Sequence, residues 1–399
     1  MRPRLRRNLL LLAAAIVTSF ALVEAGLRAA GFSAPSFYTR DLLRGGVLRP
    51  GAAGLWNREG RDFVRISSRG QRDREHDLDK PPGTLRIAVL GDSYAEAMQL
   101  PLDQAFWAVL ERELAGCAPL AGRPVEVLNF GVSGYGTAQE LLALRHAAWK
   151  YSPDIVLLAF VTGNDVRNNS RELEGDPDRP YFVERDGRLV LDESFRARHP
   201  PPWRLRLREA ASELLNRVRL LQLLKAAAVA AGAPAGSAPR TAVGDGSPGL
   251  DDDVYGPPRT PQWEAAWRVT EGLLGLLADE VRARGSRLLV VTLSNPEQVH
   301  PDDAAREAFT RVRGLDDLFY PDRRIAAACE RLRLPALALA PPLLDLARRT
   351  GEFLHGFGDR RGDGHWNARG HRVAGELIAA ELCSAVAGTA ATAPPAGAR

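Results

Sequence analysis

The stretch Leu85-Arg-Ile-Ala-Val-Leu-Gly-Asp-Ser93 decides the fold of this 399-residue chain. Its first six residues form a short, largely apolar run, which suits a strand buried on both faces of a parallel sheet. Gly91-Asp92-Ser93 then ends the strand and places a serine hydroxyl at the carboxyl edge of the sheet. Because serine also caps helices at such positions, the tripeptide alone does not assign a function.

The same pattern recurs along the chain. Further strands are predicted at Val125–Asn129, Ile155–Val161, Arg287–Leu293 and Leu334–Leu339, and helices at 104–114, 139–150, 262–284, 322–331 and 371–382. Strands that alternate with helices favour a parallel sheet with right-handed crossovers. We therefore predict an α/β fold: a doubly wound, flavodoxin-like, parallel five-stranded sheet flanked by helices, with a helical insertion and an N-terminal membrane segment.

The N-terminus resembles a membrane-targeting segment. Four arginines among the first seven residues precede an apolar run from Leu9 to Val23, which is a positive region followed by a hydrophobic one. A spanning helix needs about 20 largely apolar residues. Val23-Glu24-Ala25 also fits a signal-peptidase site, so cleavage after Ala25 stays open, although we favour an uncleaved anchor. Because positive charge stays on the cytoplasmic side, both readings predict an extracytoplasmic domain, periplasmic or at the cell surface, which is secreted if cleavage occurs.

Five parts of the chain are predicted. Residues 1–31 form the anchor or signal peptide, 32–84 a juxtamembrane segment with a strand at 63–66, 85–387 the main domain, 166–261 an insertion within it, and 388–399 a disordered tail. The insertion contains an amphipathic, Arg- and Leu-rich helix predicted from Trp203 to Ala230. A flexible Gly/Ala/Pro/Ser stretch follows, from Ala231 to Gly249. Four roles remain open for this insertion: a lid, a substrate-recognition element, a decorative insert or a helix on the membrane surface.

Composition restricts the class of protein. The chain is 45% hydrophobic and 26% charged, which is typical of a globular protein. Its net charge is only +4, and no basic stripe with interleaved aromatics indicates a nucleic-acid partner. Cys117, Cys329 and Cys383 lie far apart, which argues against a zinc site. One disulfide is an alternative in an oxidising compartment, but we favour three buried thiols.

Three more polar motifs follow predicted strands or open a helix. They are Asn129-Phe-Gly-Val-Ser-Gly-Tyr-Gly-Thr137, Gly163-Asn-Asp165 and Asp363-Gly-His-Trp-Asn367. Glycine lets a backbone N–H turn toward a bound oxygen, and an asparagine amide donates a hydrogen bond without carrying charge. A carboxylate beside an imidazole orients the ring. With Ser93, these motifs supply what acyl transfer needs. The remaining histidines are interpreted as surface or structural residues: His76, His146, His199, His300, His355 and His371.

As a set, these blocks resemble those of the SGNH (GDSL) hydrolase superfamily, over about 85–382 and interrupted by the insertion. The resemblance implies that Ser93 is the nucleophile and that Asp363 and His365 complete a catalytic triad. It also implies an oxyanion hole formed by the backbone N–H groups of Ser93 and Gly134 and by the Asn164 side chain, with no metal and no cofactor.

The last block departs from the commonest family pattern, because one residue rather than two separates Asp363 from His365. Its Asp-x-His-Trp form resembles the periplasmic polysaccharide O-acetyltransferases related to the alginate acetylation proteins. Asp359 is the alternative to Asp363 as the acidic member of the triad. We therefore expect a serine ester hydrolase that removes O-acetyl or other O-acyl groups from a small molecule or carbohydrate through an acyl-serine. A polysaccharide O-acetyltransferase, a lipase or thioesterase, and a non-enzymatic glycan-binding protein are the alternatives.

Overall fold

The computed structural model describes residues 3–120, 122–198, 202–230 and 251–392. Its central sheet has five parallel strands in the order β11-β10-β7-β5-β6, which is the flavodoxin-like order. The strands are β5 (Leu85–Gly91), β6 (Val125–Asn129), β7 (Ile155–Val161), β10 (Arg287–Leu293) and β11 (Ala336–Ala338). The predicted fold class is confirmed.

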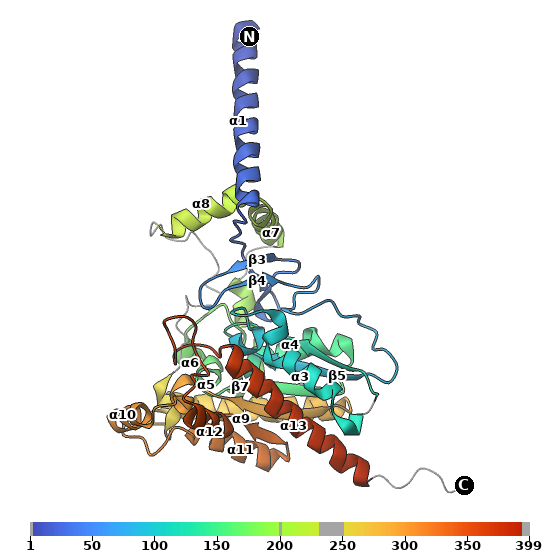
Figure 1. Cartoon of the computed structure of the whole chain (residues 1–399), viewed down its shortest axis with the longest axis vertical. Helices are drawn as coiled ribbons and strands as arrows, with labels where there is room; N and C mark the ends of the chain where they lie inside the picture. Colours follow the sequence, from blue (N-terminus) through green and yellow to red (C-terminus); the bar gives the residue numbers. More distant parts are fainter. Residues whose placement is uncertain (1–2, 121, 199–201, 231–250, 393–399) are drawn as a thin grey trace, which may run out of the picture.

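Helices cover both faces of this sheet (Figure 1). Alternate side chains of a strand point to opposite faces, so Ile87 and Val89 of β5 join one core cluster and Ala88 and Leu90 the other. The first face carries α3 (Phe106–Ala115), α12 (Ala340–Thr350) and α13 (Ala368–Thr392). The second carries α4 (Thr137–His146), α9 (Pro261–Ala283) and α11 (Tyr320–Leu332). Helix α13 is longer than predicted, because residues 388–392 continue it, and residues 393–399 lie outside the described part.

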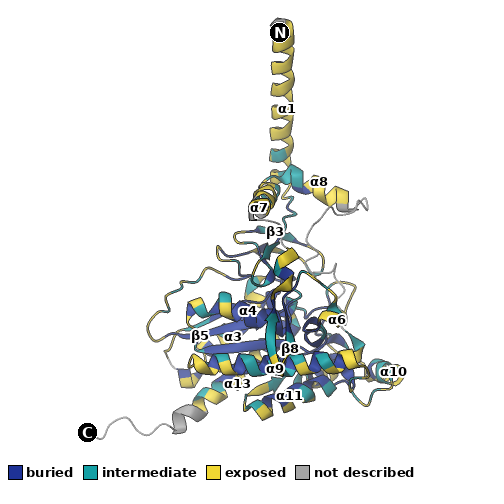
Figure 2. Ribbon diagram, turned by 180° about the vertical axis from the view of Figure 1, so that it is seen from behind, coloured by how far each residue is buried: buried dark blue, intermediate teal, exposed yellow. Residues whose placement is uncertain are grey.

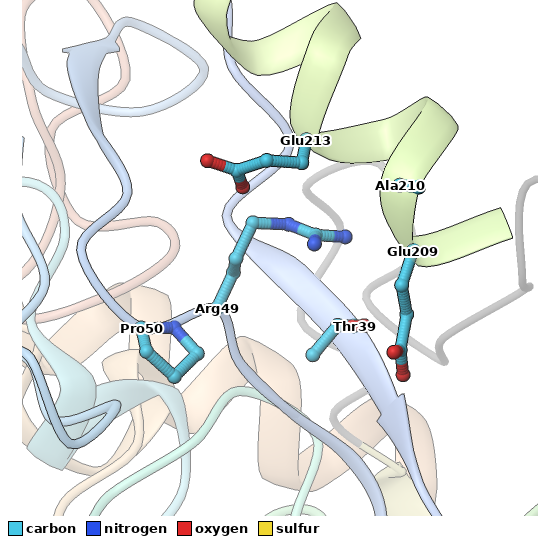
Figure 3. A pocket seen from close by; sticks show the side chains of 6 residues that line it. All are labelled: Thr39, Arg49, Pro50, Glu209, Ala210 and Glu213. Carbon is cyan, nitrogen blue, oxygen red and sulfur yellow. The ribbon is translucent and has the colours of Figure 1, made fainter. Parts of the chain in front are cut away.

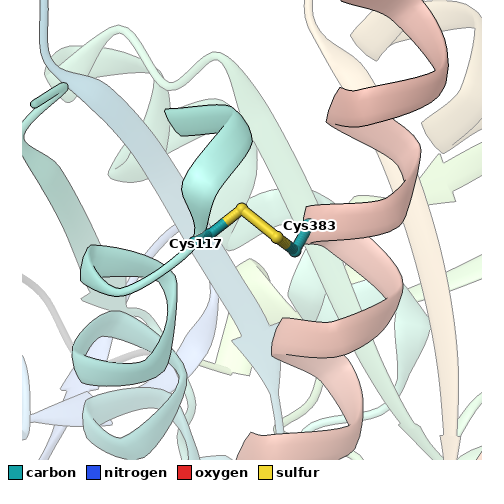
Figure 4. The surroundings of a disulfide bond; sticks show 2 residues. All are labelled: Cys117 and Cys383. Carbon is teal, nitrogen blue, oxygen red and sulfur yellow. A yellow bond between two sulfur atoms is a disulfide. The ribbon is translucent and has the colours of Figure 1, made fainter. Parts of the chain in front are cut away.

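A disulfide joins Cys117, just after α3, to Cys383 on α13 (Figure 4). The two Cα atoms are 5.9 Å apart, and Cys329 is a buried free thiol. The expectation of three thiols was therefore wrong for this pair. Both cysteines lie where α3 and α13 pack together, a contact between distant parts of the chain that their spacing in the sequence does not reveal.

The N-terminal helix α1 (Pro3–Ala29) projects away from the domain and is exposed except at Glu24 and Leu27 in its last turns (Figure 2). It is long and apolar enough to cross a membrane. The segment that follows packs onto the main domain. It forms two hairpins, β1 (Tyr38–Asp41) with β2 (Gly45–Leu48) and β3 (Ala53–Trp56) with β4 (Asp62–Arg65). A small core cluster unites their apolar side chains with Val132 and Tyr135, which follow β6. The sequence predicted only the strand near 63–66.

The insertion contains more structure than predicted. It forms α5 (Asp165–Asn168), α6 (Arg171–Glu174) and a hairpin of β8 (Tyr181–Arg185) with β9 (Arg188–Asp192). The helix predicted from Trp203 to Ala230 is two helices, α7 (Pro202–Arg217) and α8 (Arg219–Ala230), which break at Val218. The flexible stretch predicted at 231–249 lies outside the described residues. Two further helices are α2 (Ser93–Glu96) and α10 (Asp303–Arg313).

Candidate active site

Ser93 stands at the first position of α2, directly after β5. The Asp92 carboxylate accepts a hydrogen bond from the Tyr94 N–H at 2.9 Å and so caps this short helix. A Cβ atom at Gly91 would lie 2.8 Å from the Cβ of Ala95, so the tight strand-to-helix turn requires a glycine here. The turn leaves Ser93 half-buried while its neighbours are buried.

The imidazole of His365 meets Ser93 at this edge of the sheet. Its Nε2 lies 2.8 Å from the Ser93 Oγ, although 272 residues separate the two in the sequence. His365 is buried, and the Tyr94 ring packs against it at a centroid distance of 4.9 Å. The sequence-predicted pair of serine and histidine is therefore brought together in the geometry that proton transfer requires.

The carboxylate that holds the other side of the His365 ring belongs to Glu59. Its Oε2 contacts the ring Nδ1, and its Oε1 accepts a hydrogen bond from the His365 backbone N–H at 2.8 Å. Glu59 lies in the turn between β3 and β4, in the segment between α1 and the main domain. The Trp56 indole N–H donates to the Glu59 carbonyl at 3.1 Å and fixes that turn.

Asp363, the predicted third member of the triad, lies elsewhere. Its Oδ2 pairs with the Arg360 guanidinium at 2.6 Å, and its side chain is 54% exposed. Since Glu59 occupies the Nδ1 side of the ring, the structure does not place Asp363 or Asp359 there. The adjacent Gly364 has a φ of 80°, and a side chain at this position would collide with the Glu59 carboxylate. In this structure the Asp-Gly-His motif thus supplies the space that Glu59 needs rather than the acid.

Glu59 and His365 affect each other's protonation. Burial by itself lowers the pKa of His365, but the hydrogen bond and charge of Glu59 outweigh it, so that the pKa is raised above 6.5. Burial acts on Glu59 in the opposite sense, yet the hydrogen bonds from His365 leave the pKa of Glu59 below its ordinary value. An ionised carboxylate at Nδ1 stabilises the imidazolium that forms when His365 takes a proton.

Asn164 reaches the same edge from the end of β7. Its Nδ2 donates to the Asp92 Oδ2 at 3.0 Å, and that oxygen also lies 3.4 Å from the Ser93 Oγ. The following residue, Asp165, accepts a hydrogen bond from the Val161 N–H at 2.8 Å, which holds the turn that presents Asn164. The predicted amide donor is therefore next to the predicted nucleophile.

The glycine block after β6 lies over the Gly-Asp-Ser turn. The Val132 N–H donates to the Gly91 carbonyl at 3.1 Å, and Gly134 has a φ of 76°, which favours glycine. The buried Glu96 of α2 holds this loop, because its carboxylate contacts the Ser133 hydroxyl and accepts a hydrogen bond from the Tyr38 hydroxyl at 2.8 Å. The loop is thus tied both to α2 and to the N-terminal hairpin.

A buried network supports the loop that carries His365. The His355 Nδ1 is 2.9 Å from the Gly364 carbonyl, and its Nε2 is 3.1 Å from the Ser294 Oγ. The Trp366 indole donates to the same hydroxyl at 2.8 Å. Burial lowers the pKa of His355 to about 3, so this ring is neutral. His355 therefore positions the backbone beside His365 and takes no part at the serine.

Comparisons with known proteins find matches among solved structures. No family model and no curated protein matches the chain. Among solved structures, an acetyl xylan esterase, AlAXEase, is 11% identical with a TM-score of 0.38, over 76% of this chain and all of that one. A lipase/acylhydrolase from Enterococcus faecalis is 13% identical with a TM-score of 0.37, over 75% of this chain and 96% of that one. A two-domain esterase (CEX) active on acetylated mannans is 12% identical with a TM-score of 0.38, over 76% of this chain and 50% of that one. These similarities are too distant to place the chain in a family.

Proposed function

We propose that this protein is a serine-dependent ester hydrolase of the SGNH type, with Ser93 as the nucleophile, His365 as the general base and Glu59 as the carboxylate that orients it. The observation that carries the proposal is the continuous contact from the Ser93 Oγ through both ring nitrogens of His365 to Glu59. A nucleophile, a base and an orienting group in hydrogen-bond reach are the geometric signature of nucleophilic catalysis.

The proposed reaction has two halves. Neutral His365 accepts the Ser93 proton while the Oγ attacks the acyl carbonyl, and the imidazolium then protonates the departing alcohol. The acyl-serine that remains is attacked by a water molecule, whose proton passes to His365. Collapse of the second tetrahedral intermediate returns the proton from His365 to Ser93 and releases the acid. Glu59 stays ionised throughout, and its negative charge stabilises the imidazolium that forms in each half of the reaction.

The oxyanion is proposed to bind to the N–H groups of Ser93 and Gly134 and to the Asn164 amide. An amide nitrogen carries two hydrogens, and the Asp92 carboxylate takes one of those on Asn164. The second hydrogen is then available for the developing charge. Loss of one such donor raises the barrier by about 3–4 kcal/mol.

The substrate class that we propose is an O-acylated carbohydrate. Its support is the likeness of the Asp-Gly-His-Trp block to the sugar O-acetyltransferases. The same three residues serve hydrolysis and transfer, since the two reactions differ only in whether water or a sugar hydroxyl resolves the acyl-serine.

Labelling with a fluorophosphonate tests the serine directly. The full-length protein in detergent is expected to react at Ser93 and to hydrolyse nitrophenyl acetate, whereas S93A and H365A lose both properties. Labelling and turnover that persist in S93A would exclude Ser93 as the nucleophile, whereas a wild type that neither labels nor turns over would favour the non-enzymatic glycan-binding protein. Acetate release from acetylated glycans, with and without an acceptor oligosaccharide, then separates hydrolase from transferase.

We also propose that α1 anchors the protein in a membrane and that the domain is extracytoplasmic. The arginines before the apolar run give the positive-inside orientation. The disulfide between Cys117 and Cys383 supports an oxidising compartment.

A further inference from the structure

The two insertion helices α7 and α8 lie at the base of α1. In Figure 1, α8 extends sideways from the end of the vertical α1, and α7 is seen nearly end-on beside it. The last turns of α1 hold their junction: Arg28 donates to the Arg217 carbonyl at 2.7 Å, and the Glu24 carboxylate accepts from the N–H groups of Arg219 and Leu220 at 3.1 and 3.0 Å. Glu24 therefore caps α8, and both helices have a defined position across the axis of α1.

One face of α7 is polar and faces the domain. The Ser212 hydroxyl accepts a hydrogen bond from Arg49 at 2.8 Å, and the Asn216 amide exchanges two hydrogen bonds with the Ser36 backbone at 2.9 and 3.0 Å. Glu209 and Glu213 line a pocket of about 470 Å³ together with Arg49, between α7 and the β1–β2 hairpin (Figure 3). Both acidic side chains of α7 thus belong to its domain-facing side.

The opposite face of α7 is apolar and uncovered. Trp203, Leu207 and Leu214 have the helical spacing that puts them on one stripe, about half a turn away from Ser212 and Asn216. They are 57%, 61% and 56% exposed. Leu224 of α8 is 58% exposed. Large apolar side chains that gather on one exposed surface mark an interaction site rather than ordinary surface.

The charge of this platform, defined here as residues 202–230, is strongly positive. It contains five arginines and one lysine against two glutamates, and the glutamates are the pair beside Arg49. Arg204 and Arg208 are exposed next to the apolar stripe. An apolar stripe that includes a tryptophan and has basic residues beside it is the pattern of helices that lie in the interface of an anionic bilayer.

We propose that the platform lies on the surface of the bilayer that α1 enters, with Trp203, Leu207 and Leu214 in the boundary between headgroups and acyl chains. The inference rests on α1 as a spanning helix, as proposed above. A bilayer is favoured over a second copy of the chain because both helices cross the axis of α1 at the end from which the domain hangs (Figure 1). The apolar stripe also points away from the domain. The platform then sets the orientation of the whole domain relative to the membrane.

Depth-dependent quenching in vesicles tests the proposal. Full-length protein with Cys329, the buried thiol, replaced by alanine is reconstituted in phosphatidylcholine with phosphatidylglycerol. Separate L207C, V312C and L12C variants carry an environment-sensitive nitrobenzoxadiazole label. Lipids with a shallow spin label are expected to quench the label at position 207 about threefold more strongly than the label at 312. Position 312 is an equally apolar but remote control on α10, 80% exposed.

The label at position 12 of α1 distinguishes failure of the platform proposal from failure of the proposal that α1 spans the membrane. Quenching of position 12 by deep spin labels shows that α1 has inserted, because this position lies within the candidate span. If position 12 is quenched while 207 behaves like 312, the membrane-lying platform is excluded and the anchor stands. If position 207 is instead shielded in detergent as protein concentration rises, a second copy covers the stripe and the proposal is equally excluded.

Discussion

Glu59 accepts hydrogen bonds from both the ring and the backbone N–H of His365, although 306 residues separate the two. The carboxylate comes from the segment that leads out of α1, so the chain between α1 and the main domain contributes a side chain to the candidate site. This segment is part of the fold, because its hairpins share a core cluster with the loop after β6.

Replacement of Glu59 is the first test of this arrangement. E59Q is nearly isosteric but removes the charge that stabilises the imidazolium, so kcat for nitrophenyl acetate is expected to fall by about 10³–10⁴-fold. D363N removes an exposed carboxylate paired with Arg360 and is expected to keep kcat within about twofold. Steady-state kinetics of the two variants decide whether Glu59 or Asp363 is the carboxylate that orients His365. A D363N loss as large as that of E59Q would restore Asp363 as the acid.

The pH profile gives an independent test. His365 must be neutral to accept the Ser93 proton, and Glu59 raises its pKa. Activity is therefore expected to be full above this raised pKa and to fall as the pH drops through it. Because burial alone lowers the pKa of His365, the residual activity of E59Q is expected to persist to lower pH than that of the wild type. The measurement is kcat/KM of both proteins against pH. An acid limb that stays in place in E59Q would show that Glu59 does not set the protonation of His365.

The sequence predicted the sheet, Ser93, His365 and Asn164 because each of them belongs to a short pattern of neighbouring residues. A buried strand that ends in a polar turn is readable within about ten residues, and the carboxyl ends of parallel strands meet at one edge. Glu59 has no such signal. Its turn, Asn57-Arg-Glu-Gly60, reads as an ordinary connection, and only tertiary packing places it beside His365. The break at Val218 was missed for a related reason, because Glu24, on a distant helix, caps α8.

The buried carboxyl of Glu96 is expected to make the free energy of unfolding depend on pH near neutrality. Burial raises the pKa of this carboxyl to about 7 from an unfolded value of 4.5. Its contribution to the free energy of unfolding is therefore fully present below the unfolded pKa and is lost as the pH rises through about 7, by roughly 3 kcal/mol. E96Q stays neutral and is expected to lack this loss. Urea unfolding of wild type and E96Q at about pH 5 and about pH 8 measures the difference. Equal losses in both proteins would contradict the assignment to Glu96.

The role of Glu24 predicts that the N-terminal helix is retained. Cleavage after Ala25 would remove the carboxylate that caps α8, leaving the N–H groups of Arg219 and Leu220 without that partner. Intact-mass measurement of protein from membranes is expected to give a chain that includes residues 1–25. E24A is expected to destabilise the platform by about 1 kcal/mol, seen as faster amide exchange at the start of α8 but not in α10. A mature chain that begins at Gly26 would contradict the retained anchor.

The disulfide predicts a stability effect without a catalytic one. Cys117 and Cys383 are separated by 266 positions in the sequence, and loss of such a crosslink costs about 2–5 kcal/mol. The double variant C117A/C383A is therefore expected to unfold at lower temperature, while kcat well below its Tm stays unchanged because neither sulfur contacts Ser93, His365 or Glu59. C329A, which removes a buried thiol outside any disulfide, is the matched control for loss of a cysteine. Treatment with a reductant is expected to reproduce the shift in wild type and in C329A but to leave the double variant unaffected. A wild-type Tm that does not respond to reductant would show that the Cys117–Cys383 bond is absent or does not stabilise the packing of α3 against α13.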